Sequence, residues 1–143
     1  MNQPLFSSNE PYENLMNAAE TAFAEGQAKE SVILAQTAVE LFTEKTLGEL
    51  YTQRDIEYLK APFENLLINY NIGNSKVSKL YIALADDDIK QADFWAAFIA
   101  HTELRNALVH EAAEATIEQA RASLESVSAL IAHVRTHQAS AVS

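Results

Sequence analysis

The chain has 143 residues, of which 48% are hydrophobic, and this length fits one domain with a buried core. Only three glycines are present, none of them close to another, and cysteine is absent. These counts exclude a glycine-rich phosphate loop, a disulfide framework, a thiolate nucleophile and a cysteine-ligated metal centre. The sequence has no signal-peptide pattern and no apolar run near the length of a membrane span, so we expect a cytoplasmic protein with no membrane partner.

The charge balance is strongly acidic and argues against one class of partner. There are 20 Asp and Glu residues against 10 Lys and Arg, which gives a formal net charge of −10. Tight binding to duplex DNA depends on neutralising many phosphates, so duplex DNA is not an expected partner. A small cationic groove for a selected substrate is still compatible with this composition.

Hydrophobic residues recur every three or four positions along almost the whole chain, which predicts helices. We expect a first helix over residues 11–25, with Ser8 or Asn9 as N-cap, Pro11 in the first turn and Gly26 as its stop. We expect a second helix of about 20 residues, because six side chains at helical spacing form one stripe. They are Val32, Ala35, Val39, Phe42, Thr46 and Leu50.

The middle of the chain predicts three further helices. One begins near Pro62 and stops at residues 71–73, and the next covers residues 76–84. The triple acid at residues 86–88 is interpreted as N-capping the following helix, which runs over residues 89 to about 110. Its aromatic cluster, Phe94, Trp95 and Phe98, is expected in the core or in a dimer interface. Four tyrosines are expected to pack at the edge of the bundle: Tyr51, Tyr58, Tyr70 and Tyr81.

The last predicted helix has the clearest pattern. Thr116 is its expected N-cap, with Gln119 completing a capping box. Its apolar seam alternates steps of three and four, and His133 and His137 are expected to complement the dipole at its C-terminal end. The seam comprises Ile117, Ala120, Leu124, Val127, Ile131 and Val134.

Together these segments predict an all-α protein, a single bundle of about 4–6 helices with an up-and-down antiparallel core, in which the last two helices pack antiparallel. We expect a flexible N-terminus over residues 1–10, one helical domain over residues 11–137, and a flexible tail over residues 138–143.

Metal-binding patterns are missing from the sequence. None of the four histidines has a Glu three residues before it, as a di-iron bundle requires. The stretch from His110 to Glu114 resembles a zinc-protease motif but lacks the second histidine. We therefore expect no metal and no cofactor.

The segment from Leu104 to His110 carries the most information about function. Asn106 and His110 are four residues apart and share a helix face, so the amide is expected to orient the imidazole. Arg105 lies about 140° around the helix from His110. An imidazole that titrates near neutral pH and a permanent cation suit RNA transesterification without a metal. One histidine cannot be base and acid in the same step, so we expect a two-fold homodimer to bring two copies together.

These residues and their surroundings resemble HEPN domains. The resemblance rests on Phe94-Trp95, on Leu104-Arg105-Asn106-x-x-Val109-His110, and on the capped helix that begins at Thr116. HEPN domains carry Arg-x(4–6)-His with a polar residue after the Arg. The helix with Ala35, Ala38, Val39 and Glu40 is similar to an Ala- and Glu-bearing helix of that family, and the likeness spans about residues 11–135.

The resemblance implies a four-to-five-helix bundle, usually dimeric. Active HEPN members cleave RNA in the dimer cleft without metal and leave a 2′,3′-cyclic phosphate, often in bacterial toxin–antitoxin or anti-phage defence systems with a partner protein. Arg105, Asn106 and His110 match the motif and are the candidate catalytic residues. Glu40 and His101 are candidate supporting residues. The alternative is a HEPN-like bundle that only binds, as a partner subunit of a defence or nucleotidyltransferase system or as a nucleotide sensor.

The sequence departs from the family pattern after His110. Some toxin members have Tyr two residues later, where this chain has Ala112, and related sequences commonly have Gly soon after the His. We therefore expect the helix to continue past His110, with Glu111 and Glu114 beside the proposed phosphate site.

Overall fold

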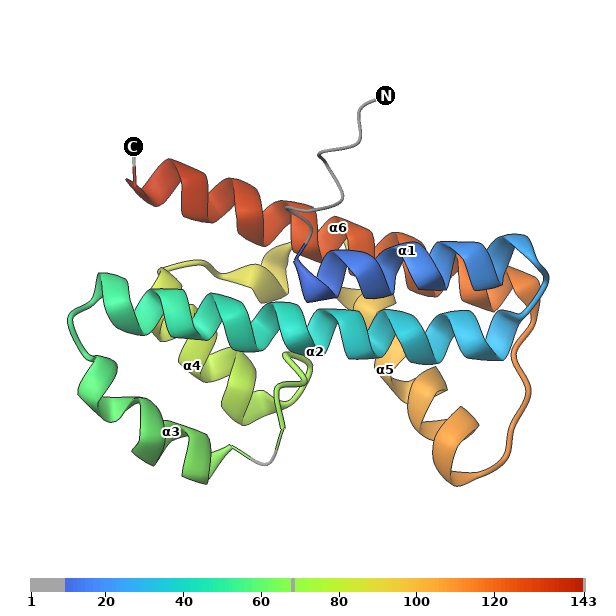
Figure 1. The fold of residues 1–143 in the computed structure, drawn as a ribbon, viewed down its shortest axis with the longest axis horizontal. Coiled ribbons are helices and arrows are strands. Elements are labelled where there is room, and N and C mark those ends of the chain that lie inside the picture. Colours follow the sequence, from blue (N-terminus) through green and yellow to red (C-terminus); the bar gives the residue numbers. More distant parts are fainter. Residues whose placement is uncertain (1–9, 68, 143) are drawn as a thin grey trace.

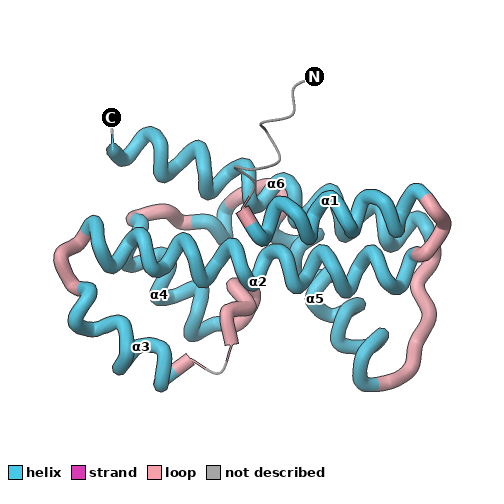
Figure 2. Tube along the Cα trace, in the orientation of Figure 1, coloured by secondary structure: helices cyan, strands magenta, loops and turns pink. Residues whose placement is uncertain are grey.

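Every regular element in the part of the chain that the structure describes is helical (Figure 1, Figure 2). The structure is a computed structural model that describes residues 10–67 and 69–142. The expected all-α bundle is confirmed. Its α-helices, in chain order, are α1 (Pro11–Ala24), α2 (Ala28–Gln53), α3 (Lys60–Leu66), α4 (Ser75–Ala85), α5 (Trp95–His110) and α6 (Ile117–Val142). Two short 3-10 turns, η2 (Glu57–Leu59) and η3 (Ile89–Gln91), precede α3 and α5.

The helices α1, α2 and α6 run alongside one another (Figure 1). α1 ends where predicted, at Gly26, whose φ of +79° is a left-handed conformation that favours glycine. Gly26 N donates to Phe23 O and Gln27 N donates to Ala22 O, which is the Schellman pattern that closes a helix. The turn reverses the chain, so that α1 packs antiparallel on α2.

The apolar stripes predicted from helical spacing form the core. All six predicted side chains of α2 are buried, as are all of the α6 seam except Ile117 at the first turn. α5 and α6 run antiparallel, as expected. The ring of Phe94, just before α5, lies 5.3 Å from that of His133 late in α6, whereas Leu108 near the end of α5 shares a buried cluster with Ala120 early in α6.

In the middle of the chain, the end of α3 and the start of α5 differ from the predictions. α3 stops at Leu66 instead of residues 71–73, because asparagine side chains compete there for backbone N–H groups. Asn69 Oδ1 accepts from Asn71 N at 2.8 Å, and Asn71 Oδ1 accepts from Gly73 N at 2.9 Å. The helix expected from residue 89 begins only at Trp95, because Ala92 is extended (φ −71°, ψ 149°) and interrupts the helical hydrogen bonds after η3.

The interpretation of residues 86–88 as N-caps is wrong for Asp86 and Asp87, whereas Asp88 does occupy the N-cap position of η3, without a side-chain hydrogen bond. Asp86 instead ends α4 in a left-handed conformation, with φ +54°. Asp87 is 7% exposed and accepts a 2.6 Å hydrogen bond from the Tyr81 hydroxyl. Nε2 of His133 lies 2.9 Å from the same carboxylate oxygen, Asp87 Oδ2. Asp87 therefore connects α4 to α6.

The roles expected for His133, His137 and several tyrosines also change. α6 continues to Val142, so neither histidine lies at its end, and the backbone is helical through most of the tail that we expected to fray. His137 Nε2 donates to Ala85 O at 2.8 Å, next to the Asp87 contact. Tyr51 and Tyr81 are buried in the core, and not at its edge, whereas Tyr58 is 77% exposed. Burial, helped by the bond to Asp87, raises the pKa of Tyr81 far above its ordinary value.

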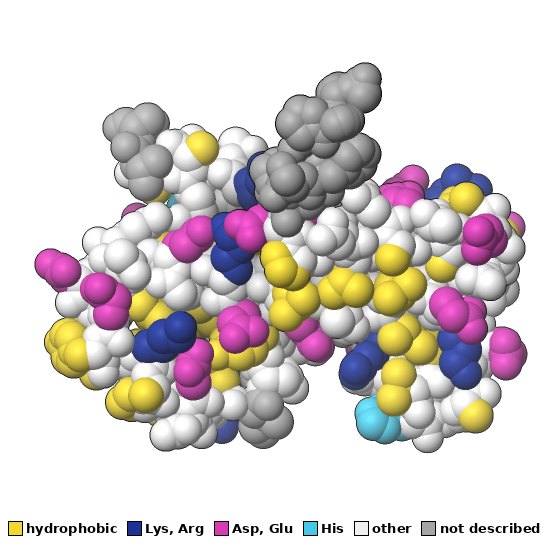
Figure 3. All heavy atoms as spheres, viewed as in Figure 1, with side chains coloured by type: hydrophobic (Ala, Val, Ile, Leu, Met, Phe, Trp, Pro, Cys, Tyr) yellow, Lys and Arg dark blue, Asp and Glu magenta, His cyan; other side chains and the backbone are white. Residues whose placement is uncertain are grey.

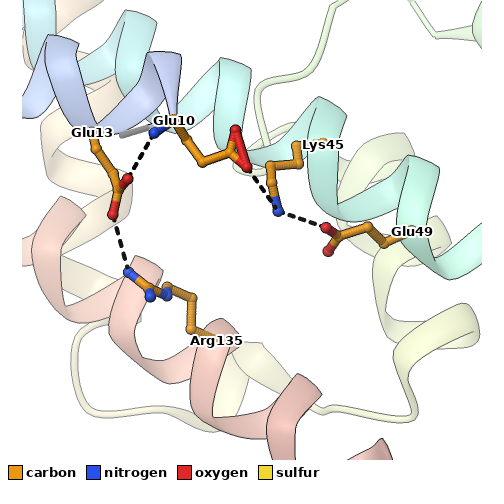
Figure 4. A network of polar contacts seen from close by, with 5 residues as sticks. All are labelled: Glu10, Glu13, Lys45, Glu49 and Arg135. Atoms are coloured by element: carbon orange, nitrogen blue, oxygen red, sulfur yellow. Dashed lines mark hydrogen bonds and ion pairs between the residues drawn. The ribbon is translucent and has the colours of Figure 1, made fainter. Parts of the chain in front are cut away.

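The N-terminal boundary is defined by side-chain contacts. Ser8 and Asn9, the predicted N-caps, lie outside the described residues. Glu10, which we placed in a flexible segment, is itself the N-cap and forms a capping box with Glu13. Figure 4 shows how charges extend from this point: Glu13 pairs with Arg135 at 3.6 Å, and Lys45 lies between Glu10 and Glu49. These ion pairs link α1 to α2 and α6.

Replacing Asp87 tests its role as the connection between α4 and α6. In Asp87→Ala the buried Tyr81 hydroxyl loses its acceptor, so we expect the free energy of unfolding to fall by about 2–3 kcal/mol. Urea denaturation followed by circular dichroism measures the change. The matched control is Asp88→Ala, an exposed neighbour, which should change stability by less than about 0.5 kcal/mol. Equal effects of the two substitutions would contradict this role for Asp87.

Candidate functional site at the end of α5

The last two turns of α5 carry the candidate site. Leu108 is buried against Val32 of α2 and Ala120 of α6, and it fixes how this end of the helix is turned. With Leu108 inward, the following two side chains point out: Val109 is 45% exposed and His110 is exposed. On the face drawn in Figure 3, basic and histidine side chains are visible on the lobe that contains α5.

α5 ends at His110, so the expectation that it continues past this residue is wrong. Glu111 N still donates to Ala107 O at 3.0 Å, but Ala112 has φ +54° and turns the chain away. The connection then leads into the predicted capping box, which is confirmed: Thr116 N donates to Gln119 Oε1 at 2.9 Å and Gln119 N to Thr116 Oγ1 at 3.0 Å. His110 is therefore the last residue of α5, and its side chain is exposed.

Arg105 has no carboxylate within ion-pair distance among residues 10–67 and 69–142. In this respect it differs from Lys45 and Arg135, which are paired within the chain (Figure 4). Its Nη1 lies 3.5 Å from Asn106 Oδ1, which is long for a hydrogen bond. Its Nε is buried and has no hydrogen-bond partner in the structure. The guanidinium is thus half-buried and electrically uncompensated.

The structure does not bring Asn106 and His110 together as predicted. Asn106 contacts Arg105 instead, and no hydrogen bond joins it to His110 in the described part of the chain. Arg105 and His110 are five residues apart on the helix, about 7.5 Å along its axis and about 140° around it. The two residues therefore flank one exposed face of α5, and neither is paired with a described carboxylate of Glu111 or Glu114.

His101 is not at the surface with these residues. It is 2% exposed, and its Nε2 lies 2.9 Å from Oε1 of Gln36 on α2. Gln36 in turn donates from Nε2 to Glu40 Oε2 at 2.8 Å. Burial, with a smaller contribution from the charge of Arg105, lowers the pKa of His101 to about 4. The two candidate supporting residues, Glu40 and His101, are thus joined through a third.

Gln36 is the residue that the sequence analysis missed. A signal for it was present, because Gln36 lies on the apolar stripe of α2, one turn after Val32 and three residues before Val39. A buried amide needs hydrogen-bond partners, so a glutamine in that position predicts a polar contact with a facing helix. Which helix supplies the contact depends on the packing of the bundle.

The aromatic cluster before Arg105 contributes packing. Phe98 is fully buried, Trp95 packs on it with ring centroids 5.7 Å apart, and Phe94 packs on His133. The expectation of core packing is confirmed for this cluster. Within the described ranges no group of three or more His, Asp, Glu or Cys side chains is placed to hold a metal ion, and no helix has the length and apolarity needed to cross a bilayer.

Neither a known protein-family model, nor a curated protein, nor a solved structure matches this chain. The assignment of a function therefore depends on the chemistry of its own residues.

The lowered pKa of His101 predicts a specific pH dependence of stability. Between about pH 6.5 and pH 4 the unfolded chain binds a proton at this position that the folded chain does not bind. The stabilisation is complete above about pH 6.5 and should decline by about 3 kcal/mol as the pH falls to 4. Urea denaturation at a series of pH values measures this slope.

His101→Gln should flatten the slope over this range, because a glutamine does not titrate. The matched control is His110→Gln at an exposed position, which should leave the slope as it is in the wild type. An unchanged slope in His101→Gln would show that the ring of His101 titrates alike in the folded and unfolded chains.

The left-handed conformation of Ala112 predicts that glycine stabilises the end of α5. An L-residue in this conformation is strained by about 1–2 kcal/mol, part of which glycine loses again in entropy. Ala112→Gly should therefore raise the free energy of unfolding by about 0.5–1 kcal/mol. The control is Ala115→Gly in the same connection, where φ is not positive and the substitution should be neutral or destabilising. A loss of stability in Ala112→Gly would contradict the strain.

Proposed function

We propose that this protein is a metal-independent endoribonuclease that acts as a HEPN-type homodimer, with Arg105, Asn106 and His110 in its site. The observation that carries the proposal is that Arg105 and His110 lie on one exposed end of α5 without carboxylate partners among the described residues. A cation and an imidazole left unpaired in so acidic a chain are suited to an anion from outside it.

The proposed reaction is an internal transesterification of RNA. The ribose 2′ oxygen attacks the adjacent phosphorus, and the bond from phosphorus to the 5′ oxygen breaks. One imidazole accepts the proton of the 2′ hydroxyl, and a second donates a proton to the leaving 5′ oxygen. The products are a 2′,3′-cyclic phosphate and a 5′ hydroxyl. Arg105 stabilises the negative charge that builds up on the phosphoryl oxygens.

A dimer supplies the second imidazole that one chain lacks. A single α5 carries one His110, and its Arg105 lies about 140° around the helix. Two-fold symmetry places the same surface of each copy in the interface, so the ends of two α5 helices can contribute two imidazoles to one phosphate. The exposed side chain of Val109, between the candidate residues, gives this surface an apolar contact. In this arrangement Asn106 keeps Arg105 directed outward.

The proposal is tested with purified protein and total cellular RNA in EDTA, with mapping of new 5′ ends and of cyclic phosphates. We expect wild-type cuts that weaken about 10²-fold or more in His110→Ala and in Arg105→Ala. Arg105→Lys should restore little activity, because a lysine lacks the planar pair of donors. The matched control is Arg54→Ala, an exposed cation after α2, which should cut like the wild type.

A dimeric, folded protein that gives no His110-dependent cut would overturn the nuclease and favour the alternative, a non-catalytic subunit that binds a partner protein of a defence or toxin–antitoxin system. Cuts that disappear with EDTA would contradict the metal-independent mechanism specifically.

A further inference from the structure

A chain of hydrogen bonds between α2 and α5 has only one consistent direction. The carboxylate of Glu40 accepts hydrogen bonds, so the atom of Gln36 that faces it at 2.8 Å must be the amide nitrogen Nε2. This leaves Oε1 of Gln36 to face Nε2 of His101 at 2.9 Å. An amide oxygen also only accepts, and Nε2 of His101 must therefore carry the proton. Glu40 thereby determines the tautomer of His101 through the orientation of the amide.

The tautomer determines what the other side of the ring offers. With the proton on Nε2, the Nδ1 atom of a neutral His101 is a hydrogen-bond acceptor. This Nδ1 is buried and has no partner in the structure. Burial keeps the ring neutral, since the pKa of His101 is lowered to about 4. A buried acceptor without a donor is costly, so such an atom in a folded protein calls for an explanation.

A matching donor lies one helical turn further along the same face. Arg105 follows His101 by four residues on α5, and its charge is felt by the His101 ring. Nε of Arg105 is also buried and also lacks a partner. Nη1 of the guanidinium reaches the surface near Asn106. One unpaired acceptor and one unpaired donor thus occur on adjacent turns of one helix.

We propose that Nδ1 of His101 accepts a hydrogen bond from Nε–H of Arg105, and that Glu40, Gln36 and His101 together are positioning residues for the guanidinium. A rotation of the arginine side chain that forms this bond would satisfy both buried atoms. It fixes the plane of the guanidinium, so that both Nη groups point outward in the fork that binds two oxygens of a phosphate. The benefit for RNA cleavage rests on the proposed function, whereas the hydrogen bonds themselves do not.

The hydrogen bonds can be tested by ¹⁵N NMR on the free protein, independently of activity. In the wild type at pH 6–7 we expect His101 to be neutral with the proton on Nε2, and the Nε–H of Arg105 to exchange slowly with water. A proton on Nδ1 of His101 in the wild type would overturn the proposal outright, because Nδ1 could then accept nothing.

Variants of the chain separate positioning from simple packing. In Glu40→Gln the new amide can donate as well as accept, so Gln36 is no longer held in one orientation and we expect a smaller fraction of His101 with its proton on Nε2. Gln36→Leu removes the amide that fixes the ring, and we expect the Arg105 Nε–H to exchange about tenfold faster. The matched control is Glu44→Leu, one turn after Glu40 on α2 and exposed, which should exchange like the wild type. Equal exchange in folded Gln36→Leu and wild type would contradict the relay.

The same variants connect the relay to catalysis. If wild-type protein cuts RNA, Gln36→Leu should lower kcat about tenfold with little change in KM, because an arginine held in place acts mainly on the transition state. The control Glu44→Leu should retain kcat. If the wild type cuts no RNA while the tautomer and the exchange rates are as expected, the proposed nuclease fails and the positioning of Arg105 stands.

Discussion

The burial of α2 is the constraint on which the rest of the structure depends. This helix lies against α1, α5 and α6, and its buried side chains extend over most of its length, from Ser31 to Tyr51. Buried polar groups on such a helix need hydrogen-bond partners, and of those on α2 the hydroxyl of Tyr51 lacks one in the structure. Thr43 has its partner within the helix, since it donates to Val39 O at 2.7 Å. Gln36 donates to Glu40 on the same helix, but its amide oxygen faces His101 on α5.

The long helices could be predicted from the sequence because their packing is periodic. A helix that buries one face must repeat apolar residues every three or four positions, and the stripes of α2 and α6 do so. The residues that begin or end some helices could also be predicted, as at Gly26 and Thr116. The bounds of the short helices could not be predicted. Between residues 66 and 75 asparagine amides compete for the backbone, and the result depends on detailed geometry that periodicity does not contain.

The pairs of polar residues in the core could not be predicted from the sequence, for a different reason. His101 and Gln36 are 65 residues apart in the chain, and His133 and Asp87 are 46 apart. A pairing over that distance is decided by the register of packed helices, which no local pattern specifies. The exposed members of the site, Arg105 and His110, were found because their spacing on one helix is local information.

Arg105 is distinguished from the other cations of the chain by the burial of its Nε atom. Among the described residues Lys45 and Arg135 are paired with carboxylates, whereas the other eight Lys and Arg side chains have no carboxylate within ion-pair distance. Arg121 lies over the ring of Phe23. Arg105 differs from these other cations because its Nε is buried without a hydrogen-bond partner.

The backbone next to His110 also distinguishes this end of α5, independently of side-chain charge. The described non-glycine residues with positive φ are Asp55, Asp86 and Ala112. Aspartate tolerates the left-handed region because its side chain can bond locally, whereas alanine has no such compensation. The strain at Ala112 is thus located two residues after the candidate acid–base group, where it ends α5 and exposes the imidazole. Strain of this kind persists where the surrounding structure enforces it, and it concentrates at functional sites. Here the connection from Ala113 to Thr116 enforces it, because its alanines pack into the cluster of Val32 and Leu108 that also anchors α5.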